Sequence, residues 1–197
     1  MTIQDQVLSS RINGILLPLA AMKTDGDWGV GDFSSLRQWT EFLASQGAKV
    51  IQILPLQETA PGETCPYSAL SAFATDPVYA DISDVPDVAA SPRAKKFVAS
   101  LAPQIATWHN AKKAPFFAVK QAKLKALWFA YQHFLQTEAA ANTPRFQAFE
   151  AYTAAQSGWL RGYAVFRAIK EFYKWQTWTQ WPEGLRNFDK TAVRMFE

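Results

Sequence analysis

The sequence contains a single cysteine, Cys65, among its 197 residues. One thiol excludes an internal disulfide and a metal centre built on several thiolates, and it agrees with a reducing compartment. No apolar run approaches the roughly 18 residues that a membrane-spanning helix needs, and residues 1–13 lack the apolar core of a signal peptide. We therefore expect a cytoplasmic protein that makes no contact with a membrane.

Histidine is nearly as scarce, because only His109 and His133 are present. Neither lies in a motif that would make it a base for Cys65, so we expect this cysteine to be structural rather than a nucleophile. The sequence also lacks a phosphate-binding motif, since Gly29 and Gly31 stand in a loop without a second feature of a nucleotide site. Backbone turning is the expected role of these glycines.

The charge is unevenly divided along the chain. Residues 1–92 carry 4 Lys and Arg against 11 Asp and Glu, whereas residues 93–197 carry 16 against 6. A basic half invites a nucleic-acid hypothesis. We favour solvated helix faces instead and expect no nucleic-acid partner, because the lysines are spread along amphipathic helices without a binding motif; they include Lys112, Lys120, Lys123 and Lys125. The shift in composition at about Ser91 predicts a boundary between two regions.

Two apolar runs predict a first pair of strands. Residues 50–56 are apolar except for Gln52, with Pro55 near the end of the run, which predicts a strand buried on both faces. Residues 12–19 form a similar run. Between them, an apolar face at helical spacing follows Ser34 and Ser35, either of which would cap the helix, and Gly47 would end it. The pattern predicts a parallel βαβ unit with a right-handed crossover.

Beyond Ser91 the pattern is helical and contains no strand. Ser91 is expected to cap a helix that Pro103 kinks or splits. A longer helix is expected from about Phe116, and Thr143 precedes another. The apolar positions of the helix from about Phe116 are Leu124, Leu127, Trp128, Tyr131 and Leu135.

Three blocks resemble a known family. They are Gln-Ile-Leu-Pro-Leu at 52–56, Cys-Pro-Tyr-Ser-Ala-Leu-Ser-Ala-Phe-Ala at 65–74 and Asp-Pro-Val-Tyr at 76–79. They resemble the 4-alpha-glucanotransferases, also called amylomaltases or disproportionating enzymes, of the α-amylase-like barrel superfamily. The resemblance runs from about Arg11 to Arg186 and departs at Ile51, Cys65 and Gly162, where the family usually has Trp, Ser and Asp.

The resemblance implies an α/β fold. Residues 1–90 would form the first two strands of a TIM (β/α)8 barrel, with their crossover helix and a substrate-side loop, and residues 91–197 a mainly α-helical insertion. An eight-stranded barrel typically takes about 250 residues. The chain is therefore expected to be the N-terminal portion of such an enzyme, with the C-terminal barrel portion as its partner.

The implied activity is transfer of α-1,4-glucan segments between maltooligosaccharides, or glucans derived from starch or glycogen, by a retaining double displacement without a cofactor. Retention needs two carboxyl groups about 5 Å apart. No residue here matches the family's catalytic motifs, and Glu58 and Glu63 are expected to be exposed loop carboxylates. We therefore expect no catalytic residue in this chain, no metal site, and no activity by the chain alone.

The resemblance assigns glucan binding to Tyr67. Its ring offers a flat apolar face to a sugar and its hydroxyl a hydrogen bond. Ser68 and Asp76 are expected to hold the loop and are possible cleft residues, as is Trp28. Three later tryptophans are also candidates for lining a cleft: Trp175, Trp178 and Trp181. Two alternatives stay open: a stand-alone glucan-binding or helical interaction module without catalysis, and one half of a split enzyme.

Overall fold

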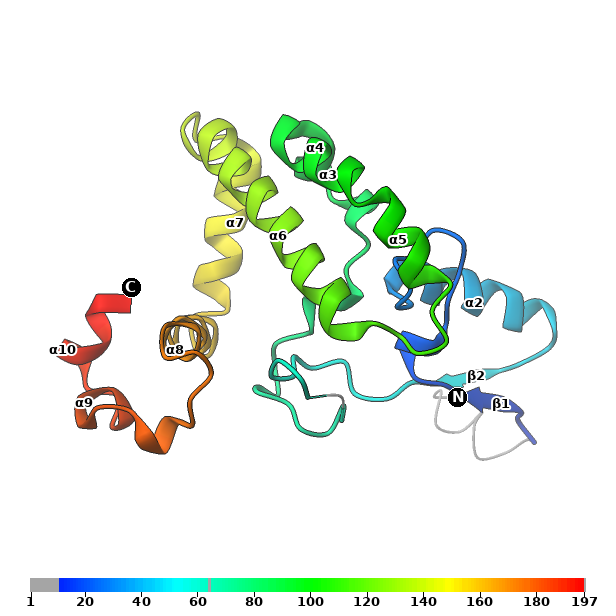
Figure 1. Cartoon of the computed structure of the whole chain (residues 1–197), viewed down its shortest axis with the longest axis horizontal. Helices are drawn as coiled ribbons and strands as arrows, with labels where there is room; N and C mark the ends of the chain where they lie inside the picture. The colour runs from blue at the N-terminus through cyan, green and yellow to red at the C-terminus, as the bar shows by residue number, and fades with distance from the viewer. Residues whose placement is uncertain (1–10, 64, 197) are drawn as a thin grey trace, which may run out of the picture. The chain divides into compact units, whose positions relative to one another are not determined.

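The computed structural model describes residues 11–63 and 65–196, and these fold as two compact units (Figure 1). The first unit holds the described residues up to Leu70 together with Ala74–Leu135. The second unit consists of Ser71–Phe73 and the described part of Gln136–Glu197. The division between the units therefore comes later in the chain than the composition shift at about Ser91, because the helices that follow Ser91 pack into the first unit.

The first unit begins with the predicted βαβ arrangement. Strand β1 (Gly14–Leu16) pairs in parallel with β2 (Val50–Gln52), and helix α2 (Phe33–Ser45) connects them. Ile15 pairs with Ile51 at the centre of this register. The parallel pairing confirms the prediction, whereas the right-handed sense of the crossover stays a prediction.

The prediction that the second strand is buried on both faces is wrong. The strand comprises only three residues, and its flanking side chains are exposed while Ile51 is half-buried. Leu16 on β1 is 54% exposed. The described residues contain a sheet of just these two strands, so the apolar runs lack the neighbouring strands that would bury them.

Helix α2 is capped two or three residues earlier than expected. Asp32, rather than Ser34 or Ser35, is its N-cap, and the Asp32 carboxylate accepts a hydrogen bond from the backbone N–H of Ser35 at 3.1 Å. An aspartate at this position also suits the positive end of the helix dipole. Gly47 adopts a positive φ of 84° just beyond the last turn, as predicted for the residue that ends the helix.

Four helices and two short 3-10 turns complete the first unit. The turns are η2 (Pro77–Tyr79) and η3 (Ile82–Asp84), and the helices are α3 (Pro86–Ala90), α4 (Pro92–Ser100), α5 (Ala102–His109) and α6 (Phe116–Phe134). A further 3-10 turn, η1 (Leu19–Ala21), follows β1. Ser91 caps α4 as predicted, and Pro103 lies in the first turn of α5, where a missing N–H costs no hydrogen bond. The expected split at Pro103 is confirmed.

Helix α6 buries a different face from the one expected. Its buried positions are Val119, Lys120, Ala122, Lys123, Ala126, Ala130 and Phe134. Trp128, Tyr131 and Leu135 are instead exposed. Alanines let the helix approach its neighbours closely, and the buried face packs against α3, α4 and η2. The core of the unit gathers here, with Leu19, Met22, Val30, Val78 and Val119 among its most buried members.

The second unit is helical in its described residues. A π-helical turn, η4 (Leu135–Ala139), leads to α7 (Pro144–Ala155), capped by Thr143, and then to α8 (Leu160–Phe172). The short segments η5 (Trp178–Gln180), α9 (Glu183–Arg186), α10 (Lys190–Val193) and η6 (Arg194–Phe196) follow. Its core consists of Val165, Ile169, Trp181, Leu185 and Val193. Across the described part of both units, no helix combines the length and the apolar character that crossing a bilayer requires.

Candidate functional site

The segment after β2 doubles back on itself at the carboxyl ends of the two strands. Isolated antiparallel bridges join Gln57 to Thr75 and Thr59 to Ala69. Between them, Glu58 donates its N–H to the carbonyl of Ala74 at 2.8 Å, and its own carbonyl accepts from Leu70 at 2.7 Å. We call the described residues 57–63, 65–70 and 74–76, all of the first unit, the hairpin loop. It begins where ligand sites form in parallel α/β folds.

Tyr67 lies near the tip of the hairpin loop and is 72% exposed. The tip turns where Ser68 donates its N–H to the carbonyl of Cys65 at 3.0 Å, and Cys65 in turn donates to the Glu63 carboxylate at 2.7 Å. Ser68 is also exposed. The tip thus presents an aromatic ring and a hydroxyl to solvent on a turn that its own hydrogen bonds support.

Asp76 lies at the base of the hairpin loop and is 1% exposed. Its carboxylate accepts from the backbone N–H of Val78 at 3.0 Å and of Thr59 at 3.3 Å. The ammonium of Lys120 on α6 is 2.8 Å away. These contacts match the expected role of holding the loop, because one carboxylate joins both of its ends.

Glu58 joins the same cluster, so the prediction that it is an exposed loop carboxylate is wrong. It is 4% exposed, and its Oε1 lies 3.3 Å from Nζ of Lys120. Lys120, itself 4% exposed, also donates to the carbonyl of Thr59 at 2.9 Å. One ammonium therefore stands between two buried carboxylates, a placement that keeps otherwise costly charges paired.

The phenol of Tyr79 is packed beside this cluster. Burial raises the pKa of Tyr79 to about 12, and the negative charge of Asp76 acts in the same direction. Proximity of an anion disfavours a second negative charge, so the hydroxyl stays protonated far into the alkaline range.

A second buried lysine lies one turn further along α6. Lys123 donates to the carbonyls of Val78 at 2.9 Å and Ala80 at 2.7 Å, and its ammonium lies 3.2 Å from the Asp32 carboxylate. Burial lowers its pKa, and Asp32 and other nearby carboxylates oppose that shift. Lys123 thereby links the loop after β1 to the segment after the hairpin loop.

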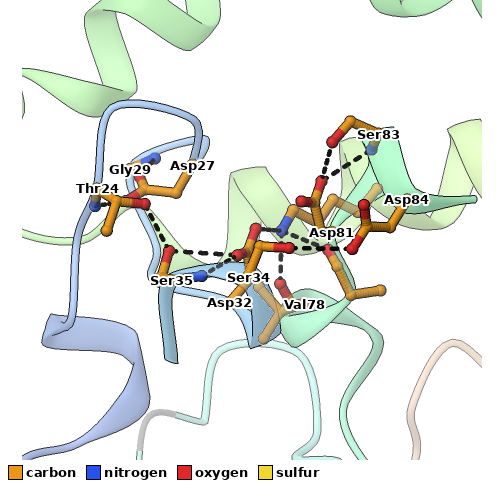
Figure 2. Close-up of polar contacts among 12 residues, drawn as sticks. Thr24, Asp27, Gly29, Asp32, Ser34, Ser35, Val78, Asp81, Ser83 and Asp84 are labelled. Atoms are coloured by element: carbon orange, nitrogen blue, oxygen red, sulfur yellow. Dashed lines mark hydrogen bonds and ion pairs between the residues drawn. The ribbon is translucent and has the colours of Figure 1, made fainter. Parts of the chain in front are cut away.

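Figure 2 shows the polar contacts around the N-terminus of α2, where Asp32 lies near Ser35 and Asp81 lies beside Ser83. Burial works to raise the pKa of Asp81, yet hydrogen bonds from Ser34 and Ser83 outweigh it and hold that pKa below its usual value. Asp32 is buried and paired with Lys123, whereas Asp84 is exposed and lies 3.7 Å from the exposed guanidinium of Arg37.

The glycine-rich loop before α2 is built tightly against α5. The Asp27 carboxylate accepts from the backbone N–H of Thr24 at 2.5 Å and of Gly29 at 2.6 Å. Gly29 has a positive φ of 92°, and a Cβ there would lie 2.4 Å from the carbonyl oxygen of Trp108. Trp28, which the sequence marks as a possible cleft residue, has its ring in the hydrophobic core of the first unit.

The three tryptophans of the second unit that the sequence marks as candidate cleft residues differ in burial and in contacts. Trp181 is buried in the core, whereas Trp178 is exposed. The ring of Trp175 lies under the guanidinium of Arg167, 4.7 Å from the ring centroid. A role for any of them in a cleft stays a prediction.

Lys120 and Lys123, which the sequence places on a solvated face, are buried at the site instead, so that expectation is wrong. Their burial, together with the alanines beside them, shows that this face of α6 is the packed one. No local feature of the sequence marks this burial, because the carboxylates that pair with the two lysines lie 44 or more positions away along the chain. Among the described residues, no three His, Cys, Asp or Glu side chains come together as a metal site requires.

Most of the chain matches one known protein family. Residues 17–197 match the family described as 4-alpha-glucanotransferase. The 4-alpha-glucanotransferase of Synechocystis sp. is 30% identical over 193 residues, which cover 96% of this chain and 35% of that protein. The enzyme of the same name from Chlamydia pneumoniae is 28% identical over 173 residues, covering 88% of this chain and 31% of that protein.

A solved structure shows the same fold. It is the amylomaltase from Streptococcus agalactiae in complex with acarbose, which superposes with a TM-score of 0.68 at 22% identity. The match covers 95% of this chain and 35% of the other. The chain thus spans about a third of the length of the relatives it matches. With 181 of its residues inside the family match, the chain belongs to the 4-alpha-glucanotransferase family.

Proposed function

We propose that this chain is the N-terminal portion of a 4-alpha-glucanotransferase and forms one wall of its glucan cleft. In that enzyme, α-1,4-glucan segments pass from one maltooligosaccharide to another through a covalent intermediate. Double displacement with retention requires a carboxylate nucleophile and a carboxylic acid. Both would come from the remaining portion of the barrel, and β1 and β2 would be the first two of its eight strands.

The observation that carries this proposal is the placement of Tyr67. An exposed aromatic ring stands on a loop whose base is fixed by buried charges, at the carboxyl ends of parallel strands. Sugar rings stack on such faces, and a fixed base lowers the entropy lost when a ligand binds. The exposed hydroxyl of Ser68 is a second candidate contact, while Asp76 acts through the loop it anchors.

The two glutamates of the hairpin loop support a non-catalytic role for this portion. Glu58 is held by Lys120, and the carboxylate of Glu63 accepts a hydrogen bond from the backbone of its own turn. A nucleophile and an acid would instead face a shared substrate atom from both sides. The inferred enzyme acts in the cytoplasm on glucans derived from starch or glycogen and uses no cofactor.

The exposed apolar residues in and just before the strands favour this proposal over a stand-alone module. Leu16 and Val50 in the strands and Ile12 just before β1 are all more than a third exposed, beside a sheet of two strands. Apolar strand residues in that position fit the presence of further strands in the working protein. The same observation accommodates a split enzyme, in which a second chain provides those strands.

Maltotriose disproportionation tests the proposal. The chain alone is expected to release no glucose and to form no longer oligomers, whereas the chain joined to or mixed with the remaining barrel portion is expected to do both. Activity of the chain alone that disappears in Glu58→Gln would place the chemistry within these residues. Absence of transfer in the assembled protein would overturn the proposed activity.

A further inference from the structure

We propose that Lys120 is the positioning residue for Tyr67, because its buried ammonium holds both ends of the hairpin loop against helix α6. The part of this inference that concerns glucan binding rests on the proposed function. The part that concerns the loop rests on the geometry of the described residues alone.

The contacts of Lys120 fall on both sides of the loop. On the outgoing side its ammonium donates to the carbonyl of Thr59 at 2.9 Å and lies 3.3 Å from the Glu58 carboxylate. On the returning side it lies 2.8 Å from the Asp76 carboxylate. Since Lys120 is on a helix that packs in the core, these contacts fix the loop to the hydrophobic core of the unit.

The two carboxylates make this attachment dependent on the charge of Lys120. Glu58 and Asp76 are both buried beside it. When one partner of a buried ionic cluster is removed, the remaining charges need water or protons, and the structure around them opens to admit either. Loss of the ammonium therefore separates the two sides of the loop at its base, and Tyr67 at the tip moves with them.

Lys123 provides a matched comparison. It is buried on the same face of the same helix, yet its ammonium contacts Asp32, Val78 and Ala80, none of which lies in the hairpin loop. Removing its charge is expected to destabilise the unit without releasing Tyr67. The two lysines thus separate positioning of the loop from general stability.

Amide hydrogen exchange of the chain measures the loop directly. Three N–H groups report on it: Glu58, which donates to Ala74; Leu70, which donates to Glu58; and Asp76, which donates to Leu56. In Lys120→Met these amides are expected to exchange at least tenfold faster, while amides in the middle of α2 and α6 change far less. In Lys123→Met the helix amides are expected to exchange faster, and the three loop amides are expected to accelerate no more than the helix amides do.

Equal acceleration of loop and helix amides in Lys120→Met would overturn the proposal, because it would show global loosening only. If Lys120→Met does not fold, the Asp76→Asn variant tests whether the ion pair holds the hairpin loop. It keeps the size of the side chain but removes the charge that faces Lys120, and the same three amides are expected to exchange faster than the helix amides. Unchanged loop exchange in the folded Asp76→Asn chain would also overturn the proposal.

Kinetics of the assembled enzyme test the step from the loop to glucan. Lys120→Met is expected to raise KM for maltotriose about as much as Tyr67→Ala, and the double variant about as much as either alone. Full additivity would show that Lys120 does not act through Tyr67. If Tyr67→Ala leaves KM unchanged, the proposed glucan contact fails, and the exchange experiment still decides whether Lys120 holds the loop.

Discussion

Tyr67 exposes most of its side chain on a turn at the tip of the hairpin loop. Its truncation to alanine removes a stacking surface and a hydroxyl, each worth on the order of 1 kcal/mol toward a bound sugar. We expect Tyr67→Ala to lower kcat/KM of the assembled enzyme about tenfold or more. The melting temperature is expected to stay nearly constant, because exposed side chains contribute little to folding.

Tyr67→Phe is the control for this variant, since it keeps the ring and deletes only the hydroxyl. Its loss of kcat/KM is expected to be smaller, with an unchanged melt. An unaltered kcat/KM for Tyr67→Ala alongside a lowered melting temperature would identify Tyr67 as a packing residue.

The raised pKa of Tyr79 predicts a loss of stability in alkaline solution. Its pKa is raised to about 12 by burial and by Asp76, and a tyrosine in an unfolded chain titrates near 10. The unfolded chain therefore releases this proton first, so the free energy of unfolding falls as the pH rises from about 10 to about 12. The fall should be about 2 to 3 kcal/mol.

Denaturant unfolding at a series of pH values measures this fall, and Tyr79→Phe isolates it. Lys123 has the opposite influence, since its lowered pKa adds stability as the pH approaches the ordinary lysine pKa. That contribution is common to both proteins and cancels in their difference. An identical pH dependence in Tyr79→Phe would contradict the assignment to Tyr79.

Among the elements, helix α4 depends on a single buried cap. The hydroxyl of Ser91 accepts from the backbone N–H of Ala94 at 3.2 Å, and the side chain is buried. Ser91→Ala leaves that N–H without a partner and is expected to lower the free energy of unfolding by about 1 kcal/mol. Urea denaturation measures the change.

Ser100, at the other end of α4, is the matched control. Its exposed hydroxyl donates to the carbonyl of Phe97, within the last turn of the helix. Ser100→Ala is expected to change the stability by less than about 0.5 kcal/mol. Similar losses for the two variants would show that the cap contributes nothing specific.

Helix α6 shows that the spacing of apolar residues does not by itself determine which face of a helix is buried. Its apolar residues occur on more than one side, so periodicity permits several buried faces. Large aromatic residues marked one face for the core, yet Trp128 is exposed and the alanine-rich face is buried. Close packing of backbones favours small side chains, and this requirement depends on the neighbouring elements.

For the whole molecule, the uncovered strands predict self-association. Leu16 and Val50 expose large apolar side chains next to a sheet whose described part has two strands. Exposed apolar surface beside unpaired strands recruits other chains and hydrophobic dyes. We expect the chain to bind such a dye and to associate as its concentration rises, and Leu16→Thr to reduce both effects.

Dye fluorescence and analytical ultracentrifugation measure these effects. Met195→Thr is the control, because Met195 is exposed but lies in the second unit, away from β1 in sequence. A monomer that binds no dye and melts in one sharp transition would contradict this prediction and would favour the stand-alone module.

Much of the fold followed from local features of the sequence. A proline and a glycine located the split at Pro103 and the turn at Gly47, because their backbone preferences act wherever they stand. The strands end earlier than the prolines that follow them suggest, at Leu16 and Gln52. The motif around Tyr67 identified the exposed loop and the family. These are properties of single residues and short segments, which the sequence determines by itself.

The tertiary structure alone decided how the charges are paired. Lys120 meets Glu58 and Asp76 across 62 and 44 positions of sequence, and Lys123 meets Asp32 across 91. A lysine on a solvated face and a lysine in a buried ion pair have the same local sequence, because the difference lies in what packs against it. A buried charge needs a partner, and the fold brings that partner from a distant segment. Neither the burial of these lysines nor the identity of their partners therefore follows from the local sequence.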